Sequence, residues 1–279
     1  MDTLQERWAR LAPHAELVTP AGRGPFPTVV LFHGCGGVRA HIHAYARAAA
    51  AAGWAALVVD SFAARGWSRR LAQFVVCTGL IFRGRRRAGD VLAALLGARR
   101  MPIVDPGRLV VAGWSHGAWA IMDLWAQPLA RRGEVRLADA DRGSLDGVIG
   151  GFLAYPYVGI ASASGAGRPW PRPLRLLSIV PRRDHMASVR RHLRALSAAV
   201  AAGSEVSIWS VDATHAFDEP GLAHRLFTYD EDLGAEAIRR FQAFLRSRRR
   251  RAPAALDHHP PPDRGGEVAG AVRPRLQPG

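Results

Sequence analysis

Short runs of β-branched and aliphatic residues recur along the chain and alternate with longer stretches whose apolar positions follow a helical period. The short runs are apolar at consecutive positions, which is typical of strands that are buried on both faces of a parallel sheet. Six strands are therefore expected, at residues 28–33, 56–60, 108–113, 147–154, 174–180 and 206–211.

Five helices are expected between and after these strands, and several of them end at a glycine. They cover residues 41–51, 86–98, 115–125, 186–202 and 234–247. Repeated strand-helix-strand units predict an α/β fold, with a mostly parallel central sheet and helices on both faces.

Two connections depart from this alternation. Residues 61–84 are too apolar for a solvated loop, so we expect them to fold over one edge of the sheet. Residues 155–173 are rich in Gly and Pro and are expected at the carboxyl end of a strand, where open parallel sheets bind ligands. Tyr155 and Tyr157 in this loop, together with Trp114, are the candidate substrate-binding residues.

The pattern is lost from residue 248 onward, where four consecutive Arg precede Pro-rich and Gly-rich stretches. Such a segment cannot bury enough apolar surface to offset the entropy of ordering it. We therefore predict one domain over residues 1–247, followed by a disordered tail over residues 248–279.

Composition narrows the class of protein further. Of the 279 residues, 48% are hydrophobic and eight are Trp, which excludes disorder throughout the chain. The two cysteines, Cys35 and Cys77, cannot form a disulfide framework and lack the paired spacing of a zinc site. The longest apolar stretch, residues 44–59, is interrupted by Arg47, and the N-terminus lacks a secretory signal. A cytoplasmic protein without metal or cofactor is expected.

All 38 basic residues are Arg, and the net charge is +15. A surplus of this size attracts nucleic acid and anionic lipid without any specific site. Because the Lys-free, Ala-rich and Gly-rich composition runs through the whole chain, it indicates a compositional bias of the source. We expect no specific nucleic-acid partner and no membrane span, and the sequence does not indicate an oligomeric state.

The sharpest motif is Gly113-Trp114-Ser115-His116-Gly117, which has the form G-x-S-x-G. It directly follows one predicted strand and precedes a predicted helix, which is the setting of a nucleophile elbow. Its glycines suit a turn too tight for a Cβ atom. The motif predicts Ser115 as a nucleophile; the alternative is an ordinary turn in which this Ser caps the helix.

A second Gly-rich motif, His33-Gly34-Cys35-Gly36-Gly37, closes the first predicted strand. Small residues there would let backbone N–H groups approach a developing oxyanion. The predicted donors are the amides of Cys35 and His116. The Cys35 thiol is interpreted as a small buried group without a chemical role.

A serine nucleophile needs a base, and the base needs a carboxylate that holds its tautomer. Asp184 and His215 each follow a late predicted strand, so both should lie at the same end of the sheet as Ser115. Asp212 and Asp60 are alternative acids, although either would depart from the usual order of nucleophile, acid and base along the chain.

Together with Asp60-Ser61-Phe62 and Thr214-His215-Ala216-Phe217, these motifs resemble the dienelactone hydrolase family over about residues 25–247. The resemblance implies a small α/β-hydrolase fold with a minimal lid, acting on small-molecule esters or lactones, with Ser115, Asp184 and His215 at the triad positions. The founding members of the family use Cys as nucleophile, so Ser115 favours a general serine esterase. Alternatives are an acyltransferase or peptidase, or a non-catalytic Arg-rich protein that binds anionic partners.

Overall fold

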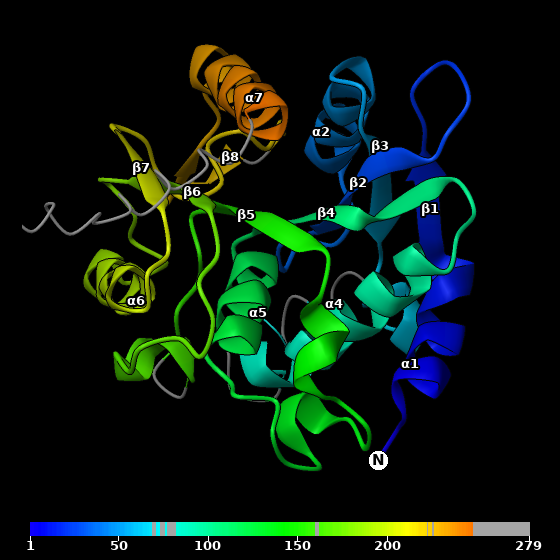
Figure 1. Ribbon diagram of the computed structural model, residues 1–279. Coiled ribbons are helices and arrows are strands. Elements are labelled where there is room, and N and C mark those ends of the chain that lie inside the picture. Colours follow the sequence, from blue (N-terminus) through cyan, green and yellow to red (C-terminus); the bar gives the residue numbers. More distant parts are fainter. Residues whose placement is uncertain are drawn as a thin grey trace, which may run out of the picture. The chain divides into compact units, whose positions relative to one another are not determined.

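The computed structural model describes residues 1–68, 71–72, 76, 82–159, 162–221, 223–224 and 226–247 (Figure 1). Residues from Met1 to Arg248 form one compact unit. The predicted tail over residues 248–279 lies outside the described residues, as do Cys77 and much of the connection at 61–84.

In the described part of the chain, seven strands form a sheet in the order β1-β3-β2-β4-β5-β6-β7. Their bounds are β1 Ala15–Val18, β2 Phe26–Phe32, β3 Ala55–Val59, β4 Val104–Trp114, β5 Val148–Ala154, β6 Leu176–Pro181 and β7 Val206–Val211. Strand β1 pairs antiparallel with β3, and the other neighbours pair in parallel. Parallel pairing brings the carboxyl ends of β2, β4, β5, β6 and β7 to one edge of the sheet.

Helices cover both faces of the sheet, as Figure 1 shows. On one face lie α2 (Ala40–Ala51) and α7 (Glu231–Arg246), and on the other lie α1 (Leu4–Leu11), α4 (Gly84–Arg99), α5 (His116–Trp125) and α6 (Val189–Ala201). Each layer of helices encloses its own apolar core against the sheet. Burial on both faces explains why the central strands are apolar at consecutive positions.

Short elements complete the described chain. They are 3-10 turns at Ala12–His14, Ala63–Arg65, Glu134–Arg136, Arg142–Leu145 and Ser164–Ala166, and an antiparallel pair of β8 (Ala223–His224) with β9 (Phe227–Thr228). Within the described residues, no helix combines the length and apolar character that crossing a membrane requires.

The predicted fold class is confirmed, and the six predicted strands and five predicted helices lie within a few residues of the observed ones. The N-terminal elements α1 and β1 are additional. Helix α1 begins at a capping box in which Thr3 and Glu6 each accept a hydrogen bond from the other's backbone N–H. Strand β1 has four residues at the edge of the sheet, so its apolar pattern is short and only half-buried.

The described part of the connection at 61–84 lies over the carboxyl ends of two central strands. Phe62 packs edge-on against His33, which follows β2, with ring centroids 4.5 Å apart. Phe82 stacks on His116, which follows β4, at 5.6 Å. This connection therefore forms part of the surroundings of the loops in which the sequence motifs lie.

Candidate active site

Ser115 lies in a tight turn between β4 and α5. Its φ of +49° and ψ of −112° are rare for a residue with a side chain. The turn also packs closely against β2: a Cβ atom at Gly117 would lie 2.1 Å from the Phe32 carbonyl oxygen, and one at Gly113 would lie 2.6 Å from the Ala118 nitrogen. Glycine is therefore required at both flanking positions of this motif.

The structure brings Ser115, His215 and Asp184 into one chain of hydrogen bonds. His215 Nε2 lies 2.8 Å from Ser115 Oγ, and His215 Nδ1 lies 2.7 Å from Asp184 Oδ2. All three side chains are buried. With Nδ1–H donating to the carboxylate, Nε2 is left as an acceptor for the serine hydroxyl. This arrangement can deprotonate the hydroxyl.

Asp184 is oriented by the backbone that follows it. Its Oδ1 accepts hydrogen bonds from the N–H groups of Met186 (2.9 Å) and Ala187 (2.8 Å), which leaves Oδ2 for His215. This Asp lies shortly after the end of β6, and His215 lies shortly after the end of β7. The two loops are neighbours because the two strands are.

The alternative acids lie elsewhere. The Asp212 side chain is 60% exposed and pairs with Arg183 at 3.2 Å. Asp60 Oδ1 lies 3.4 Å from His33 Nε2 and accepts from the amides of Phe62 and Ala63. Burial opposes the ionisation of Asp60, but His33 and these amides outweigh it and lower its pKa. Neither carboxylate contacts His215 in the described structure.

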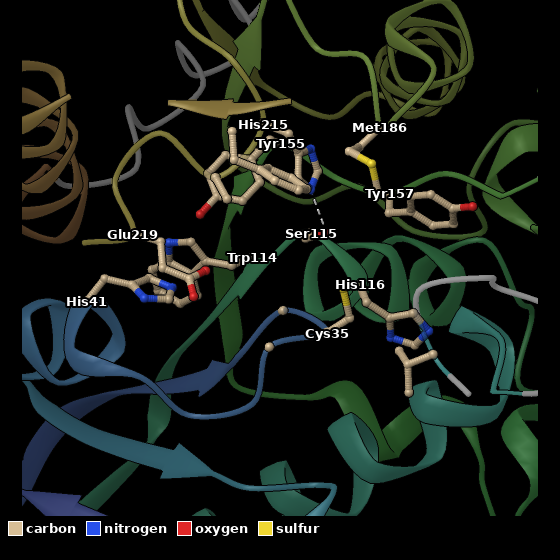
Figure 2. Close-up of a pocket in the computed structure, with 15 residues that line it drawn as sticks. Cys35, His41, Trp114, Ser115, His116, Tyr155, Tyr157, Met186, His215 and Glu219 are labelled. Carbon is tan, nitrogen blue, oxygen red and sulfur yellow. Dashed lines mark hydrogen bonds between the residues drawn. The ribbon is translucent and has the colours of Figure 1, made fainter. Parts of the chain in front are cut away.

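A cavity of about 180 Å³ opens beside Ser115 (Figure 2). It is lined by Gly34, Cys35, Gly36, His41, Val76, Trp114, Ser115, His116, Tyr155, Tyr157, Met186, His215, Ala216, Glu219 and Phe227. The three predicted substrate-binding residues and both predicted oxyanion residues are among them. Figure 2 shows Cys35 and His116 on the side of Ser115 opposite His215.

Tyr155 contributes its ring to the wall of this cavity, while its hydroxyl is engaged in a hydrogen bond outside the cavity wall. The hydroxyl donates to Asp218 Oδ1 at 2.6 Å, and the Tyr45 hydroxyl donates to Asp218 Oδ2 at 2.8 Å. Burial and the Asp218 charge raise the pKa of both phenols well above the usual value, so both remain donors. The Tyr155 ring packs edge-on against His215 at 4.9 Å and limits where the imidazole can move.

Two polar residues of the cavity wall, His41 and Glu219, were not predicted from the sequence. Burial lowers the pKa of His41 to about 4, so this imidazole is neutral at neutral pH. Glu219 Oε1 pairs with Arg39 Nε at 2.5 Å. Glu219 stands four residues after His215, but the sequence offers no sign that its loop turns back to the cavity.

The predicted oxyanion loop lies directly against the elbow. A Cβ atom at Gly34 would lie 3.4 Å from Ser115 Cβ, and Gly34 adjoins Cys35. Small residues in this loop let its backbone approach the serine closely.

In the part of the chain that the structure describes, no group of three or more His, Cys, Asp or Glu residues could hold a metal ion.

Residues 14–132 match the family model described as the dienelactone hydrolase family. Similar solved structures include a candidate dienelactone hydrolase from Klebsiella pneumoniae subsp. pneumoniae (17% identity, 83% of this chain and 91% of that chain, TM-score 0.61). A dienelactone hydrolase-like promiscuous phosphotriesterase from metagenomic libraries is 18% identical, over 83% of this chain and 90% of that chain, with a TM-score of 0.63.

A thermophilic esterase from Thermogutta terrifontis, solved with propionate bound, is 14% identical over 83% of this chain and 88% of that chain, with a TM-score of 0.56. No curated protein matches the sequence. At these identities the structures show a shared fold, and the family model adds a match in sequence. The chain thus shares the α/β-hydrolase fold of these structures, and over residues 14–132 its sequence is similar to the dienelactone hydrolase family.

Proposed function

We propose that the protein is a serine hydrolase that cleaves a carboxylic ester or lactone of a small molecule. The observation that carries this proposal is the continuous chain of hydrogen bonds from Ser115 through His215 to Asp184, at the wall of a cavity. The esterase and hydrolase descriptions of the similar structures support the same reaction class.

In the proposed mechanism, His215 Nε2 accepts the proton of the Ser115 hydroxyl as Oγ attacks the carbonyl carbon. Asp184 stabilises the imidazolium and holds its tautomer. The amides of Cys35 and His116 bind the oxyanion of the tetrahedral intermediate. His215 then protonates the leaving alkoxide, and later it activates the water that releases the acyl group.

The cavity favours a small substrate with an apolar acyl or alcohol group. Aromatic and aliphatic side chains form most of its wall, from Trp114, Tyr155, Tyr157, Met186 and Phe227. Among the described lining residues none is Arg, and the carboxylate at the wall is Glu219. Glu219 is already paired with Arg39. A neutral ester therefore fits this largely apolar wall better than an anionic one, which would be desolvated without a lining guanidinium to pair with it.

A fluorophosphonate probe tests the proposal most directly, since it reacts covalently with an activated serine. One of the similar structures is an esterase phosphonylated by sarin, a reagent of the same class. We expect labelling of the wild-type protein and none of Ser115→Ala. The variant should also lose hydrolysis of short p-nitrophenyl esters by about 10³-fold or more in kcat.

Ser144→Ala is the control, because this hydroxyl is exposed and caps a surface 3-10 turn. It should label and turn over like the wild type. If Ser115→Ala kept full esterase activity, the mechanism would be wrong. If the wild type labelled but cleaved no ester, an acyltransferase or a peptidase would replace the esterase as the favoured function.

A further inference from the structure

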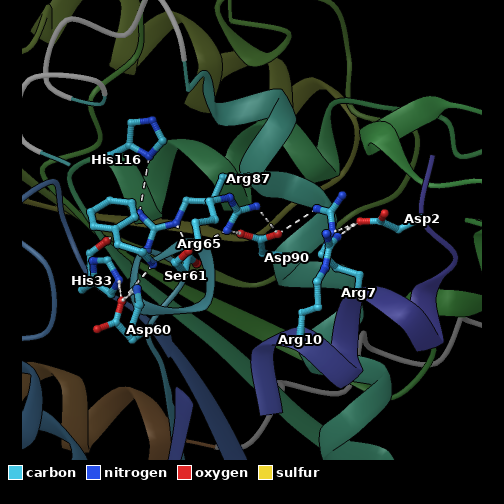
Figure 3. A network of polar contacts seen from close by, with 12 residues as sticks. Asp2, Arg7, Arg10, His33, Asp60, Ser61, Arg65, Arg87, Asp90 and His116 are labelled. Carbon is cyan, nitrogen blue, oxygen red and sulfur yellow. Dashed lines mark hydrogen bonds and ion pairs between the residues drawn. The ribbon is translucent and has the colours of Figure 1, made fainter. Parts of the chain in front are cut away.

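Arg87 is a fully buried cation close to the proposed oxyanion hole (Figure 3). It lies on α4, in a polar network that also includes Asp90, Arg65 and Arg7. The partners of the Asp90 carboxylate are Arg65, at 2.8 and 2.9 Å, and Arg7, at 2.8 Å. In the described structure, Arg87 makes its hydrogen bonds with neutral groups instead.

Two of those groups belong to the two segments that would form the oxyanion hole. Arg87 Nη1 donates to the His33 carbonyl oxygen at 2.8 Å and lies 3.4 Å from His116 Nδ1. His33 begins the loop that presents the Cys35 amide, and His116 presents its own amide directly after Ser115. A single guanidinium thus contacts both segments at once.

The tautomer of His116 favours this contact. His116 Nε2 lies 2.6 Å from the Phe82 carbonyl oxygen, which can only accept, so Nε2 carries the hydrogen. Burial and the Arg87 charge lower the pKa of His116 well below its usual value. The neutral ring therefore turns the lone pair of Nδ1 toward the Arg87 guanidinium.

Burying a guanidinium without a directly paired carboxylate is costly, and Arg87 Nη2 has no hydrogen-bond partner among the described residues. Burial lowers the pKa of Arg87 to about 10, which still leaves it charged at neutral pH. Its remaining hydrogen bond, from Nε to Ser61 Oγ at 3.2 Å, also goes to a neutral acceptor. An apolar residue could fill this space at lower cost if packing were its only role.

We propose that Arg87 is a positioning residue of the oxyanion hole, which holds the backbone at His33 and the ring of His116 at the spacing that aims the Cys35 and His116 amides at one oxygen. The inference rests on the proposed hydrolase function. Without Arg87, the two segments lose their shared donor, and the amides no longer converge on the oxyanion. Because the oxyanion forms only in the transition state, the loss should appear in kcat rather than in KM.

The experiment compares Arg87→Met and Arg87→Lys with Arg7→Met in the full-length protein. Arg7 is the matched control, because it is a buried arginine of the same network whose partners are Asp2 and Asp90. We expect Arg87→Met to lose about 100-fold in kcat, the scale of a small misplacement in an active site, with KM little changed. Arg87→Lys, which keeps the charge but not the fork of donors, should fall between Arg87→Met and the wild type. Arg7→Met should leave kcat unchanged.

Inhibition by a trifluoromethyl ketone distinguishes a role in the oxyanion hole from a merely structural role. It forms a tetrahedral adduct with the serine, and the former carbonyl oxygen of the ketone then occupies the oxyanion hole. Its inhibition constant should weaken in proportion to kcat/KM across the Arg87 variants.

Three outcomes would each overturn the inference. They are equal losses in the Arg7 and Arg87 variants, an unchanged kcat in both Arg87→Lys and Arg87→Met, and losses confined to KM. If Arg87→Met does not fold, the kcat, KM and inhibition constant of Arg87→Lys test the inference in the same way. A wild-type protein that neither labels with fluorophosphonate nor cleaves esters would instead refute the proposed hydrolase function itself, so the two failures are distinguishable.

Discussion

The two halves of the candidate site are built in different ways. On one side, the side chains of Ser115, Asp184 and His215 follow the ends of β4, β6 and β7 and form hydrogen bonds with one another directly. On the other side, the proposed donors are backbone amides, and the contacts around them come from Arg87 on a helix. The first half depends on the identity of the residues at the site, whereas the second depends on the packing behind it.

The largest effect should follow from breaking the first half at its carboxylate. Asp184→Asn would place an amide against His215 Nδ1 and favour the wrong imidazole tautomer. We expect a loss of about 10⁴-fold in kcat. Steady-state kinetics on p-nitrophenyl esters measure it, with Asp212→Asn as the control, since that exposed side chain pairs with Arg183. A mild effect of Asp184→Asn beside a severe one of Asp212→Asn would mean that the acid is misassigned.

The second prediction concerns the close contact between β2 and α5, which joins the two halves of the site. Gly117→Ala would place a methyl group 2.1 Å from the Phe32 carbonyl oxygen, so β2 and α5 would have to move apart. Because the obstacle is backbone, we expect the free energy of unfolding to fall by about 3 kcal/mol. Urea denaturation measures it. Gly143→Ala is the matched control, since its nearest contact would be an ordinary 3.5 Å; equal stability of the two variants would contradict the close approach.

The difference between the halves also explains what the sequence could predict. Consecutive apolar positions and a G-x-S-x-G motif are local signals. The first predicted the α/β fold, which is confirmed, and the second predicted a turn between a strand and a helix, where Ser115 lies. The order of strand ends then pointed to Asp184 and His215. Helix α1 also has a local signal, the Thr3 and Glu6 capping box, although it was not among the predicted helices.

The rest depends on contacts between residues that are far apart in the sequence. Arg87 lies 54 positions from His33 and 29 from His116, and its residue type is the commonest basic one in the chain. Glu219 likewise becomes part of the cavity only through the fold of its loop. Such residues have no spacing rule that a single sequence could reveal.

The third prediction concerns pH, and it tests the stability of the oxyanion side separately from the chemistry of the catalytic side. His41 lies in the first turn of α2, the helix that follows the oxyanion loop, and burial lowers its pKa to about 4. Between about pH 6.5 and pH 4, the unfolded chain therefore binds more protons than the folded one. The free energy of unfolding falls as the pH drops through this window, and the His41 contribution to that fall is about 3 kcal/mol.

His41→Gln should remove this contribution, because Gln does not titrate. Urea denaturation at a series of pH values should show a shallower loss of stability between pH 6.5 and pH 4 for the variant, and little difference between the two proteins in pH dependence above pH 7. Esterase activity, followed against pH, should keep the same form in both proteins wherever they remain folded, since the proposed base is His215 and not His41. Parallel stability curves for the two proteins would show that His41 titrates normally in the folded state. A changed activity profile without a changed stability profile would place His41 in the chemistry and blur the distinction between the two halves.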